Sequence, residues 1–166
     1  MIGAGLSLAI LFNLVGAVSG LSVVLGSQSL ESYLGLNPQP GLYAALQFLN
    51  RSTPPDAKII SYGEPRLFYL DRPYLWGEPN YHRLLDYDRI KTADDLLVAY
   101  RNLGLSHVLI NRQFFPGGTP ANERIAALLQ EALAVGRLRK LPASSDLGPY
   151  EVLAIRPPGV PAGPAS

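Results

Sequence analysis

Apolar residues fill the start of the chain. Residues 1–26 read MIGAGLSLAILFNLVGAVSGLSVVLG, and no charged side chain precedes Glu31. A helix needs roughly 20 apolar residues to cross a bilayer. A cleavable signal peptide would need a positive N-terminal region and a shorter apolar core, whereas the first basic residue here is Arg51. We therefore predict a transmembrane helix over residues 1–26.

The predicted membrane helix carries small and polar residues. Gly16 and Gly20 lie on one helix face, where small residues let a second helix approach closely. Asn13 is a polar group that prefers a helix partner in lipid. We expect contact with other transmembrane helices of the same protein, although Gly and Ser are also common in membrane helices in general.

Beyond the membrane segment, the hydrophobic pattern becomes that of a water-soluble domain. Residues 27–41 are predicted to be a juxtamembrane linker, because Pro38 and Pro40 interrupt any helix that leaves the membrane. A helix is expected from residue 41 to the Ser52–Asp56 turn, with an apolar face at Leu42, Ala45, Leu46 and Leu49. The segment AKIISY, residues 57–62, is typical of a buried strand that ends at Gly63.

The next segment, residues 64–90, is irregular. A short helical turn is expected after Glu64 and Pro65, and a short strand within residues 72–77. Thr92 and Asp95 then resemble a capping box at the start of a helix that Gly104 ends.

The rest of the chain completes an α/β pattern. We expect a buried strand at 106–111, a helix at 122–135, an edge strand at 137–141 and a final strand at 150–156. Strand, helix and strand in succession predict parallel pairing through a crossover. The predicted fold of residues 42–156 is a small three-layer α/β domain with a mostly parallel, Rossmann-like sheet, followed by a disordered tail at 157–166.

Composition excludes several functions. The net charge of +1 gives no electrostatic basis for nucleic-acid binding. Cysteine is absent, so disulfides, thiolate zinc sites and a cysteine nucleophile are excluded. The chain has no G-x-G-x-x-G, Walker or G-x-S-x-G sequence. We therefore predict no cofactor and assign no catalytic residue.

The histidines offer little chemistry. His107 opens a predicted strand and is interpreted as structural. His82 lies near Asp86 and Asp88, and these three side chains could hold a metal ion or serve a small hydrolase. A solvated loop with surface charges explains them more simply, because their spacing matches no known ligand pattern. We predict no metal site.

The densest concentration of aromatic residues lies in residues 62–81. The rings alternate there with charged side chains, which is the combination that a sugar or lipid-headgroup site needs. A small core or a docking surface needs the same combination. If the segment binds a ligand, the candidate binding residues are Arg66, Tyr69, Trp76, Tyr81 and His82.

Two phrases carry a family resemblance over residues 42–111. These are YAALQFLNRSTPPDAKIISYGEPRLFYLDRPY and DDLLVAYRNLGLSHVLIN. With the preceding apolar segment, they resemble the C-terminal extracytoplasmic region of bacterial GT-C-type membrane glycosyltransferases, the protein mannosyltransferase and aminoarabinose transferase kind.

The resemblance implies a role in sugar transfer from a polyprenyl-phosphate donor to a lipid, glycan or protein acceptor. The chain would then be a fragment, the last helix and soluble tail of an inner-membrane enzyme, with the domain on the extracytoplasmic side. The catalytic acidic residues of such enzymes lie in an early loop that this sequence does not contain. A lipid-linked sugar or its acceptor would be the partner.

A different interpretation is a stand-alone, single-pass, membrane-anchored α/β module for binding or assembly, with Gly16 and Gly20 at a dimer interface. The DNA upstream of Met1 distinguishes the two. Further hydrophobic segments and an early acidic loop in frame would favour the fragment, and a stop codon with a ribosome-binding site would favour the module.

Overall fold

The computed structural model describes residues 21, 23–29, 32, 41–79, 81–143 and 146–157. The segment 1–26 lies almost entirely outside this part, as do most of the linker and residues 158–166, so the predictions made for them stay predictions. Within the described part, no helix has the length and apolar character needed to cross a membrane.

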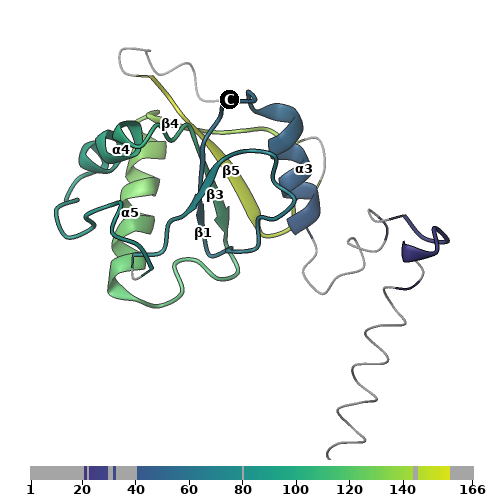
Figure 1. Cartoon of the computed structure of the whole chain (residues 1–166). Coiled ribbons are helices and arrows are strands. Elements are labelled where there is room, and N and C mark those ends of the chain that lie inside the picture. Colours follow the sequence, from purple (N-terminus) through teal and green to yellow (C-terminus); the bar gives the residue numbers. More distant parts are fainter. Residues whose placement is uncertain are drawn as a thin grey trace, which may run out of the picture.

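Helices and strands alternate along the domain, as the hydrophobic pattern predicts (Figure 1). In chain order they are α3 (Leu42–Ser52), β1 (Ile59–Tyr62), β2 (Tyr74–Trp76), α4 (Ala93–Asn102), β3 (His107–Asn111), α5 (Pro120–Ala134), β4 (Leu138–Lys140) and β5 (Tyr150–Ile155). The helical turn expected after Glu64 and Pro65 is wrong, because residues 64–73 form a loop. Two leucines of that loop, Leu67 and Leu70, pack into the core instead.

The five strands form one mixed sheet in the order β2-β1-β3-β5-β4. β1 pairs in parallel with both β2 and β3, whereas β5 pairs antiparallel with both β3 and β4. The prediction of a mostly parallel, Rossmann-like sheet is therefore corrected. Residues 141–149 join β4 to β5 as a hairpin connection, and a connection of that kind makes neighbouring strands antiparallel.

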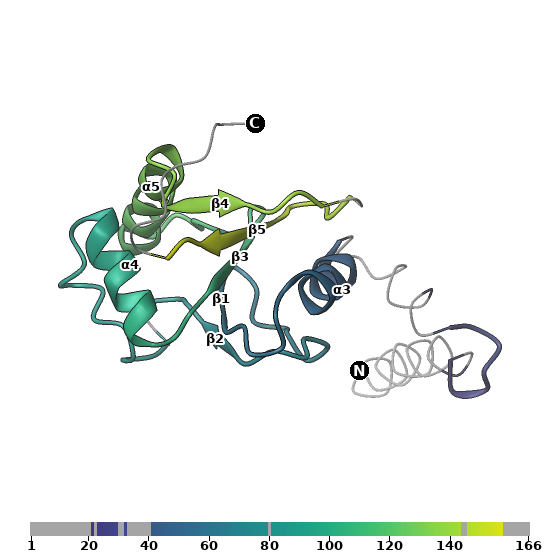
Figure 2. The same cartoon turned by 90° about the horizontal axis from the view of Figure 1, so that it is seen from above.

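Helices cover both faces of the sheet, which gives three layers (Figure 2). α3 packs on one face, over the cluster that contains Ile59, Leu109 and Val152. α4 and α5 pack on the other face, over the cluster that contains Ile60 and Val108. Successive residues of each buried strand therefore enter different cores, as the period of two in a strand requires.

Local signals fix where the helices begin. The Thr92 side chain accepts from the Asp95 amide at 3.1 Å, and the Asp95 carboxylate accepts from the Thr92 amide at 2.9 Å. This reciprocal pair confirms the predicted capping box at the start of α4. α5 begins two residues before the predicted start, because Thr119 caps it and Pro120 suits the first helical position.

Candidate functional site

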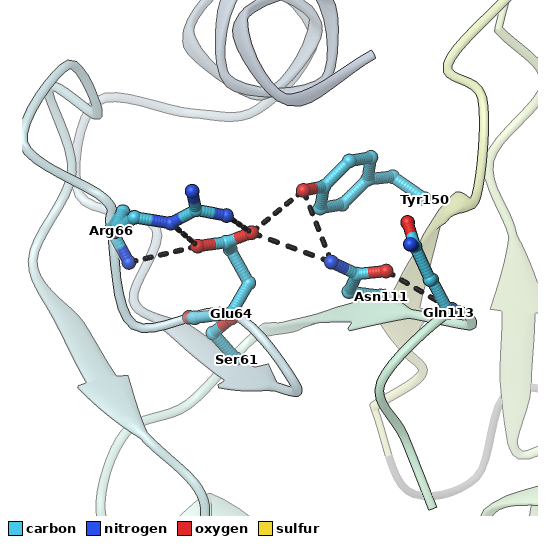
Figure 3. A network of polar contacts seen from close by, with 6 residues as sticks. All are labelled: Ser61, Glu64, Arg66, Asn111, Gln113 and Tyr150. Atoms are coloured by element: carbon cyan, nitrogen blue, oxygen red, sulfur yellow. Dashed lines mark hydrogen bonds and ion pairs between the residues drawn. The ribbon is translucent and has the colours of Figure 1, made fainter. Parts of the chain in front are cut away.

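The candidate site lies where the chain leaves two neighbouring parallel strands, β1 and β3, toward opposite faces of the sheet. The loop after β1 packs under α3 through Leu67 and Leu70, whereas the chain after β3 continues into α5 on the opposite face. In open α/β sheets, ligands bind outside the carboxyl ends of the strands at such a switch point. Here that place holds a cluster of polar side chains (Figure 3).

The centre of the cluster is Glu64, which follows β1 and is fully buried. The Arg66 side chain donates two hydrogen bonds to this carboxylate, from Nε to Oε1 at 2.8 Å and from Nη2 to Oε2 at 2.7 Å. The Arg66 backbone amide donates to Oε1 as well, at 3.0 Å. Ser61 supports the turn, because its hydroxyl donates to the Glu64 carbonyl oxygen at 2.8 Å. The loop thus holds its own ion pair in a fixed geometry.

Two further strands contribute donors to the same carboxylate. Asn111 ends β3 and faces Tyr150, the first residue of β5. The Tyr150 hydroxyl donates to Glu64 Oε2 at 2.6 Å. Asn111 Nδ2 donates to the Tyr150 hydroxyl oxygen at 3.1 Å and to Glu64 Oε2 at 3.4 Å. We call Glu64, Arg66, Asn111 and Tyr150 the Glu64 network.

Electrostatics fix the protonation states in the Glu64 network. Burial alone would raise the pKa of Glu64, but hydrogen bonds from Arg66 and Tyr150 outweigh it and lower that pKa below its ordinary value. The Glu64 hydrogen bonds raise the pKa of Arg66. Burial, and then the bond to Glu64, raise the pKa of Tyr150. Near neutral pH, Glu64 and Arg66 therefore stay charged and Tyr150 stays a neutral hydroxyl donor, which suits binding and positioning better than proton transfer.

The predicted binding residues fall into separate groups. Arg66 belongs to the Glu64 network, and its side chain is 38% exposed. Tyr69 lies on the loop beside α3 and contacts the ring of Tyr43 edge-on. Trp76 stacks on Tyr81 with ring centroids 4.1 Å apart. The structure therefore brings together Trp76 and Tyr81, while Arg66 and Tyr69 pack against other partners.

The aromatic segment 62–81 is not one surface. Tyr62 is completely buried on the α4 and α5 side of the sheet, where its hydroxyl lies 2.6 Å from that of Tyr100. Trp76 is aligned with Ser61 across the parallel strands, so it lies on the α3 side. Alternation along the two strands divides the segment between the two faces.

His82 lies in a different place, in a pocket of about 410 Å³ that Asp86, Asp88 and Arg124 also line. Its Nδ1 accepts from the Leu84 amide at 3.2 Å, and burial lowers its pKa. The ring is therefore neutral at pH 7, with its proton on Nε2. Within the part of the chain that the structure describes, no group of three or more His, Asp and Glu side chains is placed to hold a metal ion.

The sequence analysis included Arg66 among the candidate binding residues but did not identify Glu64, Asn111 and Tyr150 as its partners. Glu64 and Asn111 are polar residues at the carboxyl ends of two strands, and parallel pairing of those strands would have brought them to one edge. Tyr150 had no such signal, because its place depends on the antiparallel insertion of β5 beside β3.

No family model and no curated protein matches this chain. Among solved structures, it is similar to the C-terminal globular domain of an oligosaccharyltransferase from Archaeoglobus fulgidus, with a TM-score of 0.48 and 12% sequence identity. The similarity covers 73% of this chain and 100% of that one. At this TM-score and sequence identity, the activity of the neighbour cannot be transferred to this chain.

Proposed function

We propose that this chain is the non-catalytic C-terminal domain of a bacterial membrane glycosyltransferase. In this proposal, residues 1–26 form the last membrane helix, and the domain lies on the extracytoplasmic side of the inner membrane. There it supports sugar transfer from a polyprenyl-phosphate donor to an acceptor.

The observation that carries the proposal is the order of the elements after an uncharged segment of membrane-spanning length. The resemblance covers residues 42–111, over which the hydrophobic pattern predicts a helix, a buried strand, a short strand, a second helix and a second buried strand. α3, β1, β2, α4 and β3 follow one another in that order. The second phrase of the resemblance, residues 94–111, corresponds to α4 from Asp94 onward, the turn at Gly104 and β3.

The chemistry of the Glu64 network supports a binding role for the domain. The buried Glu64 carboxylate fixes the guanidinium of Arg66, whose side chain stays 38% exposed. A guanidinium held in one orientation suits phosphate and sugar oxygens, because its donors form a planar fork. Separately from this network, the paired rings of Trp76 and Tyr81 form an aromatic group of the kind that sugars contact.

The test compares transfer activity with stability in the full-length membrane enzyme. Arg66→Ala, Tyr69→Ala and Trp76→Ala should each lower sugar transfer at matched protein level, by more than their effect on melting temperature explains. Val98→Ala is the matched control, because Val98 is exposed on α4, on the other side of the sheet. Its activity should equal that of the unchanged enzyme.

Trp76 is half-buried, so its removal should cost about 1–3 kcal/mol of stability. If all three variants transfer sugar normally and only their melting temperatures fall, these side chains serve packing alone. An in-frame stop codon upstream of Met1 would contradict the larger enzyme and favour the single-pass module.

A further inference from the structure

A tight turn in the loop after β1 presents two aromatic rings to the outside. The Leu70 amide donates to the Leu67 carbonyl at 3.0 Å, and these two leucines are buried under α3. Between them, Phe68 is 73% exposed and Tyr69 is 40% exposed. Both ends of the turn are therefore fixed in the core while its centre projects away from it.

Aromatic side chains at the centre of an exposed turn need an explanation. Gly, Pro, Asn, Asp and Ser favour such positions, because they suit the backbone geometry or bond to it. Phe68 and Tyr69 contact each other edge-on, with ring centroids 6.1 Å apart. Tyr69 also contacts Tyr43 of α3, at 6.0 Å. We call these three residues the aromatic triad.

The backbone beneath the aromatic triad is held in place. Asn50 near the end of α3 donates to the Tyr69 carbonyl at 2.9 Å and accepts from the Asp71 amide at 2.8 Å. Arg72 donates from Nη2 to the carbonyl oxygens of Asn50 and Thr53, at 2.7 and 3.0 Å. The rings are thus presented by a pre-organised turn, which reduces the entropy lost when a surface binds them.

The position of the aromatic triad points to its partner. Tyr43 lies in the first turn of α3, and the linker 27–41 enters the domain there. Fully extended, those linker residues span at most about 50 Å. The apolar segment 1–26 precedes the linker, so a bilayer that holds this segment keeps the domain at a high local concentration near its surface.

The chemistry of the aromatic triad fits the polar–apolar boundary of a bilayer. Aromatic rings with a polar edge collect at the headgroup level of membranes, and Phe is a common apolar anchor of surface-bound elements. Arg66 lies on the same loop and keeps part of its side chain in solvent, where lipid phosphates would meet it. The Arg66 guanidinium directs one nitrogen away from the Glu64 carboxylate (Figure 3).

We propose that the aromatic triad of Tyr43, Phe68 and Tyr69 seats in the headgroup region of the bilayer that holds residues 1–26. The inference rests on the membrane attachment in the proposed function and adds the surface by which the domain lies against the lipid. It orients the α3 face of the sheet, with the Glu64 network, toward the membrane.

The absence of cysteine allows a clean test by site-directed labelling. The full chain is reconstituted into vesicles of phosphatidylcholine and phosphatidylglycerol, and a nitroxide is attached to Phe68→Cys. The matched control is Val98→Cys, at a residue that is 47% exposed on α4. Collision with oxygen, which concentrates in lipid, is compared with collision with a water-soluble nickel complex.

The expected result is a several-fold higher ratio of oxygen to nickel collisions at position 68 than at position 98. Equal ratios at both positions, in a chain that floats with the vesicles, would overturn the membrane contact and leave the proposed function standing. A chain that does not float would overturn both. A label at position 68 that is shielded from both reagents would show a protein contact, and the lipid contact would be wrong.

Discussion

Replacement of Glu64 by Gln tests whether the Glu64 network stabilises the domain. Five donors meet the carboxylate: the Arg66 amide, Nε and Nη2, the Tyr150 hydroxyl and Asn111 Nδ2. A Gln side chain keeps one acceptor oxygen and turns an NH2 group toward the remaining donors. At least two hydrogen bonds to a charged group are therefore lost.

Each such bond contributes about 1.5–3 kcal/mol. Arg66 is partly exposed, so water replaces some of what it loses, and we expect a total loss of about 2–4 kcal/mol. The assay is urea unfolding of a protein comprising residues 41–157 at neutral pH, and circular dichroism monitors the unfolding. Glu131→Gln is the control: Glu131 is exposed on α5, and its replacement should change the free energy of unfolding by less than about 0.5 kcal/mol.

The pH dependence of the stability difference distinguishes the contribution of the Glu64 charge from that of its side-chain shape. The folded domain lowers the pKa of Glu64 from its ordinary value of 4.5, so this group stabilises the fold above that value. The stabilisation is lost as the pH falls through the pKa of the folded state. The difference between the unchanged domain and Glu64→Gln should therefore narrow as the pH falls below about 4.5. A difference under about 1 kcal/mol at neutral pH, or one that does not narrow in acid, would refute the reasoning.

Three further outcomes are expected. Residues 41–157 alone should unfold in one cooperative thermal transition, because both cores lie within them; a gradual, non-cooperative melt would contradict this. Val108→Asp places an unpaired charge at a fully buried site and should abolish that transition, whereas a normal melt would show that the core tolerates the charge. Thr92→Ala should lower the free energy of unfolding by about 1 kcal/mol through the lost cap, and an unchanged melting temperature would contradict that contribution.

Short-range patterns predicted most of the elements, because their signals lie within a few residues of each other. The spacing of Thr92 and Asp95 identifies the start of α4, and Gly104 identifies its end with a positive φ of 71°. The alternation of Ile59 and Ile60 between two cores follows from the strand period. Such signals fix an element without reference to its neighbours in space.

Long-range features could not be predicted in the same way. The direction of β5 depends on the hairpin after β4 and on its insertion beside β3. The bond between Glu64 and Tyr150 joins residues 86 positions apart. The aromatic residues of segment 62–81 do not share one face, because alternation in β1 sends Tyr62 into the opposite core, and only the pairing of the strands reveals this. Whether Arg66, Tyr69, Trp76, Tyr81 and His82 bind a ligand stays a prediction.

The place of β5 in the sheet sets the time at which the domain can fold during synthesis. β5 is the final strand of the domain in sequence, yet it lies between β3 and β4 and pairs with both. Until residues 150–155 leave the ribosome, β3 has an open edge and β4 has no partner strand. The nascent chain must keep that edge from pairing with other chains. A premature stop before Tyr150 would therefore remove an inner strand, and translation would release a chain without a complete core.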